Sequence, residues 1–255
     1  MNTLDNSVLG SLPSTGLADY ALRRATSADD LLALQRLRFE VFNVELQEGL
    51  ATSNANGLDA DPYDAVCDHL LVEHTPTGKV VGTYRMQTGT AAAAALGYYC
   101  AQEFDFSVYS HLRGEVVELG RACIAKDHRN FTVLSMLWRG IAQYALEHDA
   151  RYLLGCSSLS SQDPADGVAA YAAMRSNMSP PQYHTVPCAG YELDMSVAAT
   201  NNFKTPKLLS AYLAMGAWIC GPPAIDRTFG TIDFLTLLDL QSPDMAQRRK
   251  RFGIE

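Results

Sequence analysis

The order of apolar and polar residues predicts a strand, a turn and an amphipathic helix near the middle of the chain. Residues 115–124 alternate in polarity and are rich in β-branched side chains, which is typical of a strand. After a polar turn at 126–130, apolar residues recur at helical spacing from Phe131 to Ala145. Glu118 and Arg121 stand three residues apart on the strand, so we expect their side chains on opposite faces. Charges in an apolar strand are costly unless each has a partner or a task.

The same patterns predict elements on both sides of this unit. Strands are expected at 20–25, 67–73, 79–87, 151–157 and 230–240, and helices at 28–44 after Ser27, and at 91–95, 163–176 and 206–214. A polar loop at 47–66 and an irregular stretch at 178–205 lie between them. The order is less regular than a doubly wound sheet requires, and no Gly-x-Gly-x-x-Gly motif begins a helix. We predict the α/β class, as an α+β sandwich around a mixed central sheet.

Composition indicates one globular domain with two appendages. The 255 residues are 47% hydrophobic and 19% charged, enough to bury a large core without disulfides. We assign 1–18 to a flexible arm, 19–240 to the folded domain and 241–255 to a basic tail. The net charge of −8 argues against nucleic-acid binding, and no apolar run is long enough for a membrane span.

We expect a cytoplasmic protein, with peripheral contact to the inner membrane as an open alternative. That alternative rests on the basic run 248–251, which is either a solvated tail or a patch for an acidic partner or membrane surface.

The loop at 47–66 carries three carboxylates, Asp59, Asp61 and Asp64, around a proline. Such a cluster can bind calcium, but this one lacks the ligand spacing and the terminal glutamate of a calcium loop. The six cysteines form no Cys-x-x-Cys pair, and no histidine stands at metal-ligand spacing from them. We therefore predict reduced thiols and no bound metal. A cationic amine is then the simplest ligand for the aspartates.

Several ordered motifs resemble one family of acyltransferases. They are Arg36-Leu37-Arg38-Phe39-Glu40-Val41-Phe42, Tyr63-Asp64, Cys67-Asp68-His69-Leu70-Leu71-Val72, Val80-Val81-Gly82-Thr83-Tyr84-Arg85, Ala101-Gln102-Glu103-Phe104-Asp105, Glu118-Leu119-Gly120-Arg121, Leu137-Trp138-Arg139-Gly140-Ile141, Gly216-Ala217-Trp218-Ile219-Cys220-Gly221 and Asp233-Phe234. Together they are similar to the bacterial L-ornithine N-alpha-acyltransferases of ornithine-lipid synthesis, often labelled hemolysin-like. The resemblance implies the Gcn5-related N-acyltransferase fold with a splayed central sheet. The chain also resembles the acyl-homoserine lactone synthases, which share that fold.

The resemblance assigns roles to charged residues. The lactone synthases carry an arginine in the first helix, an Asp-x-x-Asp pair in the next loop, an arginine at the end of the hairpin and Glu-x-x-Arg on the central strand. The corresponding residues are Arg38, Asp61 with Asp64, Arg85, and Glu118 with Arg121. Glu118, with Arg121 beside it, is the predicted catalytic base for the acceptor amine, a contribution of roughly 10²- to 10⁴-fold. The other four either bind the amino-acid acceptor or pair with one another and order the loop.

Both families take their acyl group from acyl carrier protein, and the resemblance implies this donor here. The turn Arg129-Asn130-Phe131-Thr132 contains no glycine, so its backbone cannot closely approach the pyrophosphate of coenzyme A. We therefore expect an acyl-phosphopantetheine arm rather than acyl-CoA, and no permanently bound cofactor. Backbone N–H groups of Ala122, Cys123 and Ile124 are the predicted oxyanion donors.

Further residues are assigned to the donor as alternatives to plain structural roles. Trp138, Phe104, Phe106 and Tyr109 either line an acyl tunnel or belong to the core. Lys126, Arg129 and Arg139 either meet the acidic carrier protein or form a solvated face. Cys123 invites an acyl-enzyme hypothesis, although no histidine is placed by sequence to activate it.

The leading hypothesis is an N-acyltransferase that moves a 3-hydroxylated long-chain acyl group from acyl carrier protein to the α-amine of ornithine, giving lyso-ornithine lipid. The alternatives are an N-acyl amino acid synthase with another acceptor, an acyl-homoserine lactone synthase, and a non-catalytic module that binds carrier protein or lipid. At this point the acceptor, the chain length, the need for a 3-hydroxyl group and the oligomeric state are open.

Overall fold

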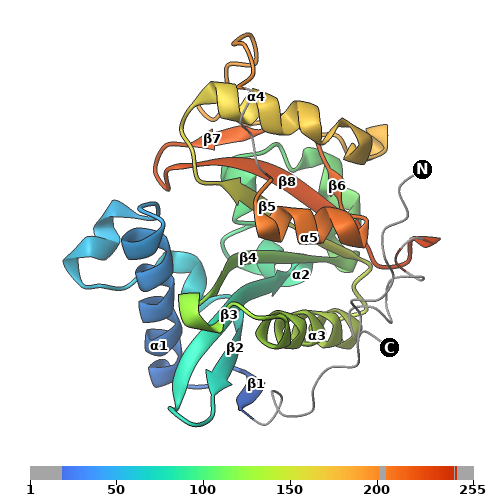
Figure 1. Cartoon of the computed structure of the whole chain (residues 1–255). Coiled ribbons are helices and arrows are strands. Elements are labelled where there is room, and N and C mark those ends of the chain that lie inside the picture. The colour runs from blue at the N-terminus through green and yellow to red at the C-terminus, as the bar shows by residue number, and fades with distance from the viewer. Residues whose placement is uncertain (1–18, 201–204, 244, 246–255) are drawn as a thin grey trace, which may run out of the picture.

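A sheet runs through the middle of the molecule with helices packed against it (Figure 1). The computed structural model describes residues 19–200, 205–243 and 245, so the predicted arm at 1–18 and the basic run at 248–251 lie outside the described residues. Within them, eight strands have the order β1-β2-β3-β4-β5-β8-β6, with β7 also paired to β8. Their bounds are β1 Tyr20–Arg24, β2 Asp68–His74, β3 Lys79–Thr88, β4 Val116–Ile124, β5 Tyr152–Leu159, β6 Trp218–Ile219, β7 Ala224–Asp226 and β8 Thr231–Asp239. This mixed sheet confirms the predicted fold class.

The centre of the sheet is where strand direction changes. β1 to β4 pair antiparallel in chain order, and β5 pairs antiparallel with β8. β4 and β5 run parallel, and their pairing extends only from Val116–Tyr152 to Glu118–Leu154. Beyond Glu118 the two strands diverge, so the C-terminal half of β4 is not paired with β5.

Two helices cover one face of the sheet. α3 (Phe131–Glu147) and α5 (Lys207–Met215) share a core cluster with apolar side chains of β2, β3 and β4. Trp138 of α3 contacts Tyr212 of α5, with the ring centroids 5.0 Å apart. On β3, Tyr84 and Met86 belong to this cluster, so Arg85 and Gln87 point to the opposite face.

The remaining helices complete the molecule. α1 (Ala28–Phe39) and the loop after it cover the face that carries Arg85, α2 (Gly89–Ala94) follows β3, and α4 (Pro164–Ala173) packs against β8. Ser27 Oγ accepts a hydrogen bond from the Asp30 N–H at 3.1 Å, as expected for an N-cap. Past Phe39 the predicted first helix continues as a π-helix, Glu40–Glu45. The short strands β6 and β7 were not predicted, because two or three residues show no period.

A β-bulge in β4 corrects one prediction. Between the pairs Thr83–Cys123 and Arg85–Gly120, β4 contains one residue more than β3, and Arg121 takes a φ of +48°. Bulges of this kind are common beside active sites because they redirect a side chain. The extra residue places Arg121 on the same face as Glu118 and Arg85, so the expectation that Glu118 and Arg121 point to opposite faces is wrong.

Gly155 allows the close approach of β4 and β5 just before they diverge. A Cβ at this position would lie 2.2 Å from the Leu119 carbonyl oxygen. Because that oxygen belongs to the backbone, we expect Gly155→Ala to lower the free energy of unfolding by about 1–3 kcal/mol, measured by urea denaturation. Gly114→Ala is the control, since a Cβ there meets nothing within 4 Å. Equal stability of the two variants would contradict the close-approach argument.

Candidate active site

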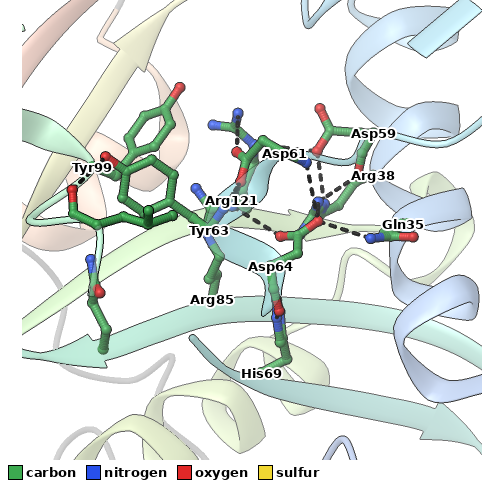
Figure 2. Close-up of polar contacts among 12 residues, drawn as sticks. Gln35, Arg38, Asp59, Asp61, Tyr63, Asp64, His69, Arg85, Tyr99 and Arg121 are labelled. Carbon is green, nitrogen blue, oxygen red and sulfur yellow. Dashed lines mark hydrogen bonds and ion pairs between the residues drawn. The ribbon is translucent and has the colours of Figure 1, made fainter. Parts of the chain in front are cut away.

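Three arginines and three aspartates alternate in a closed ring on the face that carries α1 (Figure 2). Arg38 Nε lies 2.8 Å from Asp59 Oδ1, and Arg38 Nη2 lies 2.6 Å from Asp64 Oδ2. Arg85 Nη1 lies 2.9 Å from Asp64 Oδ1 and 2.6 Å from Asp61 Oδ1. Arg121 closes the ring, with Nη2 3.0 Å from Asp61 Oδ2 and Nε 3.2 Å from Asp59 Oδ1.

The ring is buried and electrically neutral. None of its six side chains is more than 9% exposed. The sequence left two alternatives for these arginines and aspartates, binding of the acceptor or pairing with one another. The structure contains the pairing. Asp59, to which the family resemblance assigned no role, supplies the third carboxylate. The three aspartates are neutralised by arginines, so they do not form the free cation site expected from the sequence.

The ring also lowers the pKa of Asp64 and holds an aromatic side chain in place. Burial alone would raise the pKa of Asp64, but the hydrogen bond from Arg38 and the charges of Arg38 and Arg85 outweigh burial and leave that pKa well below its usual range. The Tyr99 ring lies beneath two guanidinium groups, 5.0 Å from Arg85 and 4.7 Å from Arg121. The segment that follows α2 is thereby held against the sheet.

Glu118 lies at the point where β4 and β5 part. Its Oε2 accepts hydrogen bonds from Gln87 Nε2 at 2.5 Å and the Tyr99 N–H at 2.9 Å, and its Oε1 accepts one from the Cys100 N–H at 2.8 Å. The residue is 4% exposed and lines the cavity described next. A carboxylate has about four acceptor sites, so these three donors orient Glu118 and leave one site for a ligand.

A cavity of about 680 Å³ occupies the space between the diverging halves of β4 and β5. One wall is apolar and comes from α3, α5 and the end of β3, with Leu134, Leu137, Leu208, Leu209, Tyr84 and Tyr212. Another wall is the bulge itself, Gly120 to Ala122. Arg85 and Arg121 reach the cavity, whereas Arg38 lies behind them and does not. This shape joins an apolar compartment to a charged one at Glu118.

Comparison with known proteins decides the family. A family model described as an acetyltransferase (GNAT) domain matches residues 37–139. The L-ornithine N(alpha)-acyltransferase of Brucella abortus is 32% identical over 241 residues, covering 88% of this chain and 86% of that protein. This chain belongs to the L-ornithine N(alpha)-acyltransferase family. The family member from Rhodobacter capsulatus is 31% identical and aligns over 91% of this chain and 94% of its own length.

Solved structures agree with the fold of this family. The acyl-homoserine lactone synthase LasI superposes with a TM-score of 0.50 at 14% identity, covering 92% of this chain and 94% of that one. FeeM, an N-acyl amino acid synthase from uncultured soil microbes, gives 0.51 at 13% identity, with 91% and 93% covered. Family membership and the GNAT domain confirm the prediction of an N-acyltransferase.

The residues assigned to the acyl donor divide into two groups in this ornithine N-acyltransferase family member. Ala122, Cys123, Ile124, Arg129, Asn130 and Phe131 line the cavity, whereas Thr132 and Trp138 do not. Trp138 is buried in the main core, and Phe104, Phe106 and Tyr109 lie in a second core cluster, away from the cavity wall. The apolar wall comes instead from leucines of α3 and α5, whose helical spacing does not distinguish them from core residues.

The glycine-free turn before α3 is held by its own side chains. Arg129 donates two hydrogen bonds to the Glu45 carboxylate, at 2.6 and 2.7 Å, and one to the Ile124 carbonyl at 2.9 Å. Asn130 Oδ1 accepts from the Val133 N–H at 3.0 Å and caps the helix. Lys126 and Arg139 are exposed.

Cys123 is unsuited to form a covalent acyl-enzyme. Burial raises the pKa of its thiol to about 12, and a thiol that stays protonated at neutral pH is a weak nucleophile.

Four carboxyl groups without a predicted role gather beside the cavity. Glu48, Glu103, Asp226 and Asp233 all line it, and we call them the acidic quartet. Glu103 and Asp233 stand in two of the motifs that carry the family resemblance. Their place in those motifs is the feature of the sequence that could have pointed to a function for them. Their convergence could not be read from the sequence, because Glu48, Glu103 and the β7–β8 pair that carries Asp226 and Asp233 are far apart in the chain.

The described residues include no helix that is both long and apolar enough to cross a membrane.

Proposed function

We propose that this protein transfers a 3-hydroxylated long-chain acyl group from acyl carrier protein to the α-amine of L-ornithine, giving lyso-ornithine lipid. The observation that carries the proposal is the cavity between β4 and β5, which joins an apolar wall to a charged compartment at Glu118. The names of the relatives in Brucella abortus and Rhodobacter capsulatus support ornithine as the acceptor.

The apolar wall suits the acyl chain, because each buried methylene contributes about 0.8 kcal/mol. The turn before α3 supports the carrier protein over coenzyme A as the donor. A pyrophosphate would need open backbone N–H groups at the helix N-terminus, but Asn130 already caps that end and Arg129 is paired with Glu45. A phosphopantetheine arm carries no pyrophosphate and needs neither contact.

The charged compartment provides for the amino acid. Arg85 Nη2 is buried without a hydrogen-bond partner, and Arg85 lines the cavity. This nitrogen is the donor in the ring that is free to meet the acceptor's α-carboxylate. Glu118 then faces the α-amine with its remaining acceptor site.

The reaction follows from these positions. The neutral amine attacks the thioester carbonyl carbon, the C–N bond forms, and the carbonyl oxygen becomes an oxyanion. Beyond Glu118, β5 no longer pairs with β4, so N–H groups on the free edge of the bulge can donate to that oxyanion. The C–S bond then breaks. Glu118 takes the proton that makes the ammonium a neutral amine and passes it to solvent, and the thiolate takes up the second proton, which the nitrogen loses as the amide forms.

A reconstituted reaction tests the proposal. Purified protein is incubated with 3-hydroxyacyl carrier protein and L-ornithine, and the products are read by mass spectrometry. We expect N-acyl-ornithine, with slower product formation from the matching acyl-CoA or from a chain without the 3-hydroxyl group. Parallel reactions contain glycine, lysine or S-adenosylmethionine. A product with one of these instead would replace the acceptor, and the lack of any N-acyl product from folded protein would overturn the proposal.

A further inference from the structure

The acidic quartet differs from the arginine–aspartate ring in having no positive partner. Glu103, Asp226 and Asp233 are 3%, 6% and 4% exposed, and oxygens of these three carboxyl groups lie within 4.8 Å of one another. In the described part of the chain, no ion pair involves any member of the quartet. Buried carboxylates without a partner are costly, so their placement beside a cavity calls for a ligand.

Individual oxygens confirm that the quartet is incomplete. Asp226 Oδ1 accepts from the N–H groups of Thr228 and Phe229, at 2.8 and 2.9 Å, and Asp233 Oδ2 accepts from Thr231 Oγ1 at 3.1 Å. Asp233 Oδ1 and Glu48 Oε2, however, are buried without a hydrogen bond of good geometry, although Ser158 and Glu103 lie beside Asp233 and Ser160 lies beside Glu48. Both residues line the cavity, so a donor that fills the cavity end would complete them.

We propose that Glu103, Asp226 and Asp233, with Glu48 beside them, bind the side-chain ammonium of the acceptor and so select amino acids that carry a second amine. This inference rests on the proposed function and names the recognition element for its acceptor. The α-amine lies at Glu118, the α-carboxylate at Arg85, and the side chain extends along the cavity toward the quartet.

The geometry fits an ammonium group. The three oxygens lie within 4.8 Å of one another, which is close enough for one nitrogen to contact all three at about 2.8 Å, the usual length of a charge-assisted N–H···O hydrogen bond. An ammonium offers three donors, and the trio offers three carboxylates. Calcium takes about six to eight oxygen ligands, a number that three carboxylates reach only if each binds through both of its oxygens.

The charge state of the empty site agrees with this assignment. Burial and the charges of Asp233 and Asp226 raise the pKa of Glu103 well above its usual range. Protons therefore neutralise part of the cluster until a cation arrives in their place.

The test compares L-ornithine with L-norvaline, which has the same carbon chain but lacks the terminal amine. We expect wild-type protein to favour ornithine in kcat/KM by about 10- to 100-fold, the range of a buried hydrogen bond to a charged group. Asp233→Asn and Glu103→Gln should reduce that preference about tenfold or more, chiefly through the KM for ornithine. Asp226 is left unchanged, because its side chain also holds the turn at Thr228. Asp29→Asn, an exposed residue of α1, removes the same charge elsewhere and should leave the preference intact.

Calorimetric titration of both amino acids into the same proteins separates the two proposals. If no acylation occurs but ornithine binds more tightly than norvaline and Asp233→Asn abolishes the difference, the cation site stands and the proposed function falls. If ornithine is acylated with a preference that the variants do not alter, the cation site falls and the function stands. Equal affinity for both amino acids also overturns the cation site. Calcium or magnesium alone that stabilises wild type but not Asp233→Asn would identify a metal site instead.

Discussion

Replacing Glu118 by glutamine is expected to lower kcat for N-acylation by about 10²- to 10⁴-fold, the usual contribution of a positioned base. Glutamine keeps nearly the same volume and one oxygen, which can accept from either the Tyr99 N–H or the Cys100 N–H, since these donate to different oxygens of Glu118. The fold should therefore persist while the proton acceptor is lost. Steady-state kinetics over a range of pH provide the measurement. The loss should shrink as the pH rises past the amine pKa of about 8, because the amine then loses its proton without help.

Gln87→Leu is the matched control for this prediction. It removes one donor to Glu118 at 2.5 Å but leaves the base in place, so kcat should fall by about tenfold or less. A Glu118→Gln protein that retains wild-type kcat would place the base elsewhere. Equal losses in both variants, without the pH-dependent recovery, would mean that Glu118 acts only by holding the Tyr99 segment.

Arg38→Met is expected to lower the free energy of unfolding by about 3–5 kcal/mol, because it leaves two buried carboxylates without their shared partner. Arg38 is fully buried between Asp59 and Asp64, at 2.8 and 2.6 Å, and methionine fills much of its volume without its charge. Since Arg38 does not line the cavity, the effect should appear in urea denaturation rather than first in KM for the acceptor.

The surface pair Arg23–Asp30 provides the comparison. Its distance is also 2.6 Å, but the Arg23 side chain is 42% exposed, and exposed ion pairs contribute about 1 kcal/mol or less. Arg23→Met should therefore be nearly neutral. If Arg38→Met proved as mild as Arg23→Met, the ring would not be what holds the 47–66 loop to the sheet.

Much of the fold could be predicted because it depends on neighbouring residues. The alternation over 115–124 and the helical spacing after it correspond to β4 and α3, and Ser27 caps α1 as expected. A side-chain pattern that repeats every two residues in a strand, or nearly every four in a helix, arises from backbone geometry within a few residues. The prediction failed at Arg121, since a bulge depends on how β4 pairs with β3 and not on β4 alone.

The candidate site was predicted only in part, because its ion pairs also depend on segments that are far apart in the chain. The motifs singled out Glu118, Arg121 and Arg85, which the structure places on the cavity wall, but they could not distinguish a paired aspartate from a free one. Asp59, Asp61 and Asp64 form a conspicuous acidic run, yet arginines from α1, β3 and β4 neutralise them.

The sequence by itself determined the order of strands and helices, the family and the residue types available for acyl transfer, because periodicity and motifs are local properties of the chain. Only the tertiary structure decided which charges are satisfied. The ring closes and the acidic quartet stays unpaired because electrostatic partners are set by distances between segments far apart in the chain. Glu48, Glu103, Asp226 and Asp233 become a site only when the end of β7, the start of β8 and two loops meet at one end of the cavity.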